Sequence, residues 1–384
     1  MVFEFATANR ILFGPGALAQ VGVRAAEIGR RAWVVSGSSR QRAVPLLVIL
    51  EEHGLATSVF TMEGEPTVER VREGTRQAAG WGADLVIAIG GGSALDAGKA
   101  LAILLTNRAD PLEYLEVIGA GKPLTLPGLP CIAIPTTAGA GTEVTRNAVL
   151  TSPEHRVKAS LRSPYILPRL AIVDPELSAS MPPAVTASTG LDALTQLIEP
   201  FVSKARSPLV DPFCREGMRR IARSLRHAFE DGGNMPARQD MALASLFGGI
   251  ALANAGLGAV HGFASPLGGM YPAPHGAVCA RLLPHVMRTN LGALRARQPG
   301  SDLSRRYDEI AELLTGIPGA SAEEGIAWVD ELCGALQVPP LRTYGVAEAD
   351  LPDIIEQARS ASSMRGNPIA LDQEELLSIL RRAL

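Results

Sequence analysis

The apolar residues of the first 175 positions fall into short runs that alternate with segments of helical spacing. Helices are expected between these runs, and the alternation of strand and helix predicts a parallel sheet with helices on both faces. Strands are expected at residues 32–36, 57–60, 85–89, 131–135 and 170–173, with an edge strand and turn at 10–16. Helices are expected at residues 17–28, 45–53 and 68–81.

Beyond residue 180 the strand pattern disappears and helical spacing takes over. Met181, Pro182 and Pro183 form a break that we interpret as the domain boundary. Helices are expected at 186–199, 303–314, 322–336, 351–359 and 373–383. The pattern therefore predicts an α/β domain over residues 1–180, followed by an all-helical domain over residues 181–384.

Three successive glycines, Gly90, Gly91 and Gly92, end the apolar run at 85–89 and precede Ser93 and a helical segment. A tight turn without side chains, followed by the free N–H groups of a helix, favours a phosphate group. The segment matches neither the GxGxxG dinucleotide motif nor the P-loop motif. The alternative is a strand-to-helix turn without a ligand, and the polar residues Asp96 and Lys99 beside the glycines weigh against it.

The loop after residues 32–36 reads Gly37, Ser38, Ser39 and Arg40, with no carboxylate. Dinucleotide-binding folds often place an acid there to hold the ribose hydroxyls, whereas an arginine accommodates a 2′-phosphate. NADP is therefore favoured over NAD. The alternative is that these arginines are only solvated.

A second small-residue loop follows the strand expected at 131–135. Flexible glycines and small hydroxyls suit contacts with a pyrophosphate and a nicotinamide. The candidate residues in this loop are Thr136, Thr137, Gly141 and Thr142.

Residues 241–280 contain no Lys, Arg, Asp or Glu, so most of them are expected to be buried. His261 and His275 lie within this stretch, each followed by glycine. Buried imidazoles need partners, because an unsatisfied polar group costs about 1–3 kcal/mol. Backbone carbonyls or a functional site would both serve. A membrane span over 241–260 is the less favoured interpretation, because serine, asparagine and four glycines make it only moderately apolar.

Composition narrows the class of protein. The net charge of −3 and the pI near 6.1 give no reason to expect a nucleic acid or a membrane as partner. Four cysteines lie far apart without a CxxC pair, which suggests reduced core residues and neither a disulfide framework nor a thiolate zinc site. The first residues lack the order of a signal peptide, so we expect a cytoplasmic enzyme.

Four segments in order resemble the iron-containing (group III) alcohol dehydrogenases, relatives of glycerol dehydrogenase and maleylacetate reductase. They are GGGSALDAGKA, IPTTAGAGTEVT, AIVDPELSASMPPAVTASTGLDALTQLIEP and HGFASPLGGMYPAPHGAVCARLLPHVMRTN. The resemblance implies a nucleotide-binding α/β domain, an all-helical domain, and a cleft between them for NAD or NADP, a small alcohol, aldehyde or ketone, and often a divalent metal. We also expect a homodimer.

The resemblance places the metal ligands on Asp192, Gln196, His261 and His275, holding Fe²⁺ or Zn²⁺. Gln196 and Ser265 stand where these dehydrogenases carry histidines, so weakened metal binding is implied. Asp192 and Gln196 are four residues apart, which places both on one helix face. Lys158 matches a lysine close to the nicotinamide, and its alternative interpretation is an exposed charge. The catalytic candidates are His261, His275 and Lys158.

Three other functions stay open. A metal-independent reductase of an oxo-acid would keep its activity after chelation. A cyclising lyase of the dehydroquinate synthase type would need several basic residues around a substrate phosphate, and the charge-free stretch argues against it. A nucleotide-binding protein without catalysis would bind NADPH but turn over no aldehyde or ketone.

Overall fold

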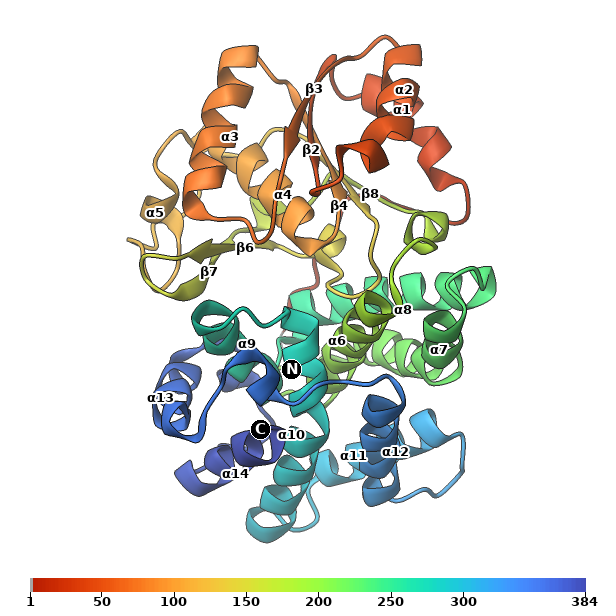
Figure 1. The fold of residues 1–384 in the computed structure, drawn as a ribbon, viewed down its shortest axis with the longest axis vertical. Coiled ribbons are helices and arrows are strands. Elements are labelled where there is room, and N and C mark those ends of the chain that lie inside the picture. The colour runs from red at the N-terminus through yellow and green to blue at the C-terminus, as the bar shows by residue number, and fades with distance from the viewer. Residues whose placement is uncertain (1–2) are drawn as a thin grey trace. The chain divides into compact units, whose positions relative to one another are not determined.

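A computed structural model describes residues 3–384, which divide into two compact units (Figure 1). The α/β unit comprises Ala6–Thr137 and Gly141–Ser178. The helical unit comprises Ala179–Leu384 together with Ala138–Ala140 and the described residues up to Phe5. Each unit has its own hydrophobic core and is described separately below.

Six parallel strands form the sheet of the α/β unit, in the order β1-β8-β5-β4-β2-β3. The order reverses at β2, because β3 adds on one side of it and β4 on the other. In such sheets ligands bind beyond the carboxyl ends of the strands at this reversal. The strands are β1 (Ile11–Phe13), β2 (Arg31–Ser36), β3 (Ala56–Thr61), β4 (Leu85–Gly90), β5 (Cys131–Pro135) and β8 (Leu170–Val173).

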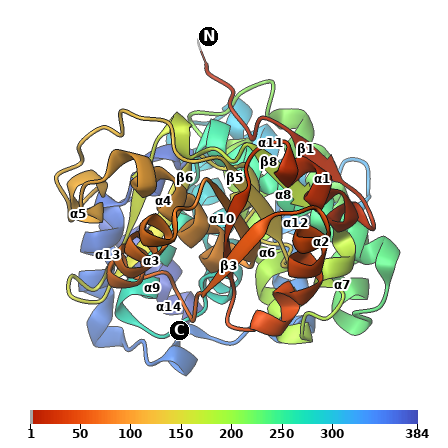
Figure 2. The ribbon, with the colours of Figure 1, turned by 90° about the horizontal axis from the view of Figure 1, so that it is seen from above.

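Helices cover both faces of this sheet, as the alternation of strand and helix predicted (Figure 2). Trp33 and Val35 of β2 pack with α3 and α4, whereas Ala32 and Val34 pack on the other face with α1 and α2. Successive side chains of a strand point to opposite faces, so β2 contributes to both cores. The helices are α1 (Val21–Ala26), α2 (Val44–Glu52), α3 (Val68–Trp81), α4 (Gly92–Asn107) and the short α5 (Pro111–Tyr114).

The prediction of a single helix over residues 17–28 is wrong in detail. A 3₁₀ turn at Ala17–Gln20 precedes the shorter helix α1. The carboxylate of Asp174, directly after β8, accepts hydrogen bonds from the backbone N–H groups of Gly16 and Leu18. This contact from a residue more than 150 positions away fixes the tight turn, which local spacing could not reveal.

The sequence pattern also missed an antiparallel hairpin formed by β6 (Asn147–Ser152) and β7 (Val157–Arg162). One face of the hairpin is buried in the same core as α4, through small and aliphatic side chains. The alternation is weak because two of the four core positions are alanines: Ala148, Leu150, Ala159 and Leu161.

Nine helices of eight residues or more make up the described part of the helical unit. Helix α6 begins at Pro183, the last residue of the break expected at residues 181–183. The nine helices are α6 (Pro183–Val202), α7 (Asp211–Glu230), α8 (Met235–Ala255), α9 (Ala259–Met270), α10 (His275–Arg297), α11 (Asp302–Thr315), α12 (Ala322–Ala335), α13 (Leu351–Ser360) and α14 (Gln373–Ala383).

The charge-free stretch spans most of α8, all of α9 and the start of α10, and most of its residues are buried as expected. Within residues 3–384 no single helix is long and apolar enough to cross a membrane. Helices α8 and α9 meet that criterion only as a pair, bent by 100° at the break between them.

Candidate metal centre and nucleotide-binding loops

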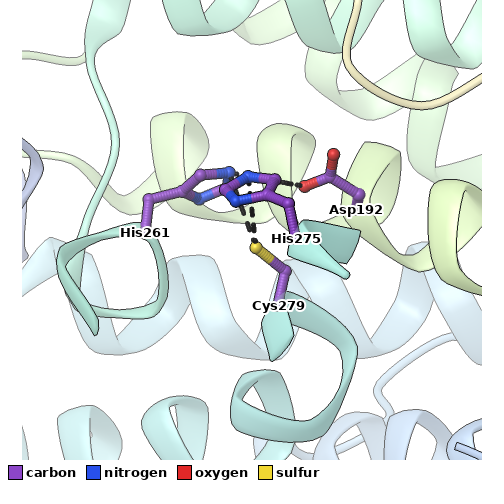
Figure 3. A group of neighbouring side chains, drawn as sticks. All are labelled: Asp192, His261, His275 and Cys279. Atoms are coloured by element: carbon purple, nitrogen blue, oxygen red, sulfur yellow. Dashed lines mark hydrogen bonds and ion pairs between the residues drawn. The ribbon is translucent and has the colours of Figure 1, made fainter. Parts of the chain in front are cut away.

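Three helices of the helical unit bring four possible metal ligands together (Figure 3). Asp192 lies on α6, His261 on α9, and His275 and Cys279 on α10. One donor atom of each residue lies within 4.8 Å of the others. The cluster is buried except at the His275 side chain, which is 36% exposed.

The glycine after His275 lets α10 approach α6 closely. His275 is the first residue of α10, and Cys279 follows one turn later on the same face. A Cβ atom on Gly276 would lie 2.4 Å from the carbonyl oxygen of Ser188 on α6. Any larger residue would push α10 away from Asp192. The two His-Gly pairs noticed in the sequence therefore have at least one packing cause.

The distances between the donor atoms fit a tetrahedrally coordinated cation. The His261 Nε2 and Asp192 Oδ1 atoms are 3.4 Å apart, and His275 Nε2 is 3.8 Å from the same oxygen. Cys279 Sγ lies 3.9 Å from His261 Nε2 and 3.7 Å from His275 Nε2. Usual zinc bond lengths in a tetrahedron give edges of about 3.3 Å between N and O and about 3.6 Å between N and S.

A carboxylate oxygen of Asp192 gives a second indication that the cluster binds a cation. Its Oδ1 atom is buried, and no group in the described residues donates a hydrogen bond to it. An orphaned carboxylate oxygen costs free energy unless a cation or a proton lies against it. The four residues present therefore fit a divalent metal.

Glu199 contacts the ring nitrogen of His261 that faces away from the cluster. Its Oε2 atom is 2.7 Å from His261 Nδ1, and its Oε1 atom accepts a hydrogen bond of 2.7 Å from the backbone N–H of Val260. The carboxylate thus takes the proton-bearing nitrogen and leaves Nε2 directed at the cluster. A carboxylate that fixes a ligating histidine in this way is usual at metal sites.

The cluster favours positive charge. Burial lowers the pKa of His261, but Cys279, Asp192 and Glu199 together raise it well above its usual value. The charge of Cys279 raises the pKa of His275 against the opposing effect of burial. Burial opposes the ionisation of Asp192, yet the two histidines hold its pKa below the usual value. A divalent cation would satisfy the same acids.

In the α/β unit, the bend at Gly90, Gly91 and Gly92 is hydrogen-bonded to the loops that follow the two neighbouring strands, β2 and β5. The backbone N–H of Gly37 donates to the carbonyl of Ile89 at 3.2 Å, and that of Thr136 donates to the carbonyl of Gly90 at 2.9 Å. The loops after β2, β4 and β5 thus meet at one edge of the sheet, at the reversal of strand order. Helix α4 begins at Gly92, and no side chain caps it.

The backbone at position 90 of this bend requires glycine. Its φ of +153° is a conformation that other residues rarely adopt, and a Cβ atom would lie 2.7 Å from that of Ala94. The other predicted phosphate contacts, Gly91, Gly92 and Ser93, follow directly at the start of α4.

Lys99 connects α4 with the second small-residue loop. Its Nζ atom donates to the carbonyl of Thr142 at 2.9 Å and to Thr145 Oγ1 at 2.8 Å, and lies 3.6 Å from Asp96 Oδ1. Lys99 is 1% exposed, so these contacts join α4 to that loop in the interior of the unit. Burial raises the pKa of Asp96 to about 6 and that of Glu143 in the same region to about 7.

The remaining predicted cofactor contacts are spread over this unit. Ser38, Ser39 and Arg40 are exposed, Gly141 is buried, and Thr137 is half-buried. Lys158 lies on β7, where its Nζ atom pairs with Glu65 at 3.1 Å and its side chain is only 9% exposed. The alternative of an exposed charge at Lys158 is therefore wrong.

Comparison with known proteins identifies the family. Residues 8–175 match the sequence profile "Iron-containing alcohol dehydrogenase", and residues 186–384 match "Fe-containing alcohol dehydrogenase family, C-terminal". The chain is 37% identical to 1,3-propanediol dehydrogenase of Klebsiella pneumoniae, over 100% of this chain and 99% of that one. The chain belongs to the iron-containing alcohol dehydrogenase family.

Solved structures of this family share the fold. A crystal structure of 1,3-propanediol oxidoreductase superposes with a TM-score of 0.92 at 36% identity, covering 100% of both chains. Sulfoacetaldehyde reductase from Bifidobacterium kashiwanohense in complex with NAD⁺ gives a TM-score of 0.87 at 28% identity, covering 100% of this chain and 99% of that one. The chain is thus an enzyme of the alcohol dehydrogenase and aldehyde reductase class, as the four sequence segments implied.

Two residues depart from the metal ligands that the family resemblance implied. Gln196 lies one turn after Asp192 on α6, where its side-chain hydrogen bond helps to lower the pKa of Asp192. Its Oε1 atom is buried and accepts no hydrogen bond from the described residues. Ser265 lies one turn after His261 on α9.

The sequence pattern does not identify Cys279 or Glu199 as residues of this cluster. Cys279 was assigned to the reduced core with the other cysteines, and no thiolate metal ligand was expected. All four cysteines are indeed free and buried, but Cys279 lies in the cluster. A single thiol among imidazoles has no CxxC signature. The i, i+4 spacing from His275 was the available signal.

Proposed function

We propose that this enzyme transfers a hydride between the nicotinamide of NADP or NAD and the carbonyl carbon of a small aldehyde or ketone, or the reverse from the alcohol. The observation that carries the proposal is the cluster of four donor atoms within 4.8 Å in a family of alcohol dehydrogenases. The relatives' names, 1,3-propanediol dehydrogenase and sulfoacetaldehyde reductase, support a small polar substrate.

The nucleotide would bind to the α/β unit at the reversal of strand order. Its diphosphate would lie against Gly91, Gly92 and Ser93, where uncapped N–H groups and the helix dipole favour an anion. Asp96, Thr136, Thr137, Gly141, Thr142 and Lys158 are proposed as further contacts. Exposed Arg40 follows Gly37, Ser38 and Ser39 and would receive a 2′-phosphate, which favours NADP.

The helical unit would hold a divalent cation, Fe²⁺ or Zn²⁺, through Asp192, His261, His275 and Cys279. When bound, such a cation supplies Lewis-acid polarisation of the substrate oxygen. The protein's own contribution is orientation. Glu199 directs His261, Gly276 places His275 beside Asp192, and the partly exposed His275 marks the open side of the cluster.

A metal-independent reductase of an oxo-acid is the second candidate. Gln196 favours it, because a neutral amide is a poorer metal ligand than imidazole. Without a cation, His261 or His275 would donate a hydrogen bond or a proton to the developing oxyanion.

The test combines metal analysis of the purified enzyme with NADPH and NADH oxidation over small aldehydes, ketones and keto acids. Oxidation that chelation abolishes and metal restores supports the metal-dependent reaction, and oxidation that survives chelation supports the second candidate. His261→Ala is expected to lower kcat/KM at least about a hundredfold, whereas His227→Ala on the exposed face of α7 should leave it unchanged. No oxidation of either nucleotide with any substrate would contradict the proposal.

We further propose that the enzyme works as a homodimer in the cytoplasm. Light scattering on the purified protein tests the first point, and a mass near that of one 40.4 kDa chain would contradict it.

A further inference from the structure

Cys279 differs from the other three cysteines in what surrounds its sulfur. All four are buried, and burial raises the pKa of Cys131 and Cys333 to about 12, so both stay neutral thiols. The sulfur of Cys333 donates to the carbonyl of Ala280 at 3.4 Å. Only the sulfur of Cys279, among these cysteines, lies within 4 Å of two imidazole nitrogens that converge on one carboxylate oxygen.

We infer that Cys279 binds the divalent cation of this site as a thiolate and makes the site prefer Zn²⁺ to Fe²⁺, although the family is named for iron. The inference rests on the proposed function in one respect, that a cation is held by this cluster. It goes beyond it by assigning the ligand type and the metal.

Geometry supports a fourth ligand at the sulfur. The four separations between donor atoms, 3.4 to 3.9 Å, lie within about 0.5 Å of the edges of a zinc tetrahedron with one sulfur. Asp192, His261 and His275 without Cys279 would supply only three of the four corners of that tetrahedron.

Charge supports the thiolate form. The Asp192 carboxylate and a Cys279 thiolate would together balance a +2 cation in a buried site, where an uncompensated charge is costly. Neither imidazole nor the Gln196 amide can supply the second negative charge. Glu199 is occupied by the N–H groups of Val260 and His261.

The chemistry of the donors then determines the metal. A thiolate is a soft ligand that suits Zn²⁺, and N/O/S sites in general bind Zn²⁺ more tightly than Fe²⁺. One carboxylate, two imidazoles and one thiolate in a tetrahedron are all usual zinc ligands. Gln196, one turn from Asp192, would orient that carboxylate through its hydrogen bond instead of completing the site.

The experiment uses the full-length enzyme stripped of metal by a chelator. The wild type is exposed without oxygen to equal amounts of Zn²⁺ and Fe²⁺, and the bound metals are counted by mass spectrometry. A parallel sample is loaded with Co²⁺, because a sulfur ligand adds a thiolate-to-cobalt charge-transfer band in the near ultraviolet. Cys279→Ser is compared with Gln196→Ala and with Cys333→Ser, whose sulfur lies outside the cluster.

We expect the wild type to take up Zn²⁺ over Fe²⁺ by at least about tenfold and to show the cobalt band. Cys279→Ser should lose the band and weaken Zn²⁺ binding by about 10–100-fold, while Cys333→Ser keeps both and Gln196→Ala keeps the band. Wild-type enzyme that binds Co²⁺ without the band, or that takes up both metals equally, would overturn the inference but leave the proposed cation site intact. Uptake of none of the three metals would overturn both. The wild-type spectrum decides the ligand even if Cys279→Ser fails to fold.

Discussion

Glu199 is the carboxylate that sets the orientation of His261. Glu199→Ala would leave the N–H groups of Val260 and His261 without their acceptor, and each buried unsatisfied donor costs about 1–3 kcal/mol. Loss of this support should also weaken metal binding by about 10–100-fold. Urea denaturation and competition with a chelator measure the two effects.

Glu199→Gln separates orientation from packing, because the amide keeps the shape and one acceptor oxygen. It should recover most of the stability but only part of the metal affinity. Glu348→Ala removes an exposed carboxylate and serves as control, with a change within about 0.5 kcal/mol. If Glu199→Ala and the wild type bind the metal with equal affinity, Glu199 contributes to packing and does not orient His261 for the metal.

Glu143 makes the stability of the α/β unit depend on pH. Burial raises the pKa of this 2% exposed carboxyl to about 7, against an ordinary value of 4.5, so the folded protein holds the proton more tightly than the unfolded chain. The free energy of unfolding should therefore fall as pH rises from about 4.5 to about 7. Glu143→Gln imitates the protonated form and should gain stability at pH 8, by up to about 3 kcal/mol, with little change at pH 4.5.

Denaturation of Glu143→Gln and wild type at both pH values tests this dependence. A stability difference that is the same at pH 4.5 and pH 8 would refute it. Glu348→Gln, on an exposed surface, should show no such trend.

Single residues also show where prediction from sequence succeeds. His261 and His275 stand out as imidazoles in a charge-free stretch, and the family resemblance adds Asp192; the structure brings the three together. Cys279 and Glu199 could not, because a buried cysteine or a helix carboxylate has many ordinary roles. Only the packing of α6, α9 and α10 gives these two their neighbours.

Helix α4 packs on the central strand β4 through a glycine. A Cβ atom on Gly98 would lie 2.5 Å from the Cβ of Ala88, so Gly98→Ala should destabilise the enzyme by about 1–3 kcal/mol. Gly80, near the end of α3, has open space around it, and Gly80→Ala should stabilise by up to about 1 kcal/mol. Urea denaturation of the pair decides whether the close approach matters, and equal effects would contradict it.

The loop after β2 predicts nucleotide preference. If Arg40 receives the 2′-phosphate, Arg40→Ala should raise the KM for NADPH by about tenfold, the loss of one charge-assisted contact. The KM for NADH should stay the same. Steady-state kinetics with both nucleotides measure this, and Arg30→Ala, at the opposite end of β2, is the control. A parallel change for both nucleotides would mean that Arg40 acts on the loop as a whole.

Strands and helices were predictable in proportion to the strength of their periodicity. The buried runs of β4, β5 and β8 and the amphipathic helices α3 and α14 were found with boundaries within one residue. The hairpin β6–β7 was not, since alanines fill half of its buried positions. The 3₁₀ turn before α1 depends on Asp174, a contact that local pattern does not contain.

The division into two units predicts separate responses to the two ligands. A ligand at 100 times its Kd raises the free energy of unfolding of the unit that binds it by about 2.7 kcal/mol. In calorimetry, Zn²⁺ should raise the transition of the helical unit and NADPH that of the α/β unit. Asp192→Asn should abolish the first shift and keep the second. A Zn²⁺ shift that persists in Asp192→Asn would place the cation elsewhere.

The pairing of β1 with β8 has a consequence for biosynthesis. Ile11 lies beside Ala171, so β1 leaves the ribosome before the other strands of this sheet and must wait for a partner 160 positions later. At roughly 5–20 residues per second, that delay is roughly 8 to 32 seconds. The nascent chain can meanwhile assemble β2 to β5, and β1 joins last, when translation delivers β8 and Asp174 to close the edge of the sheet.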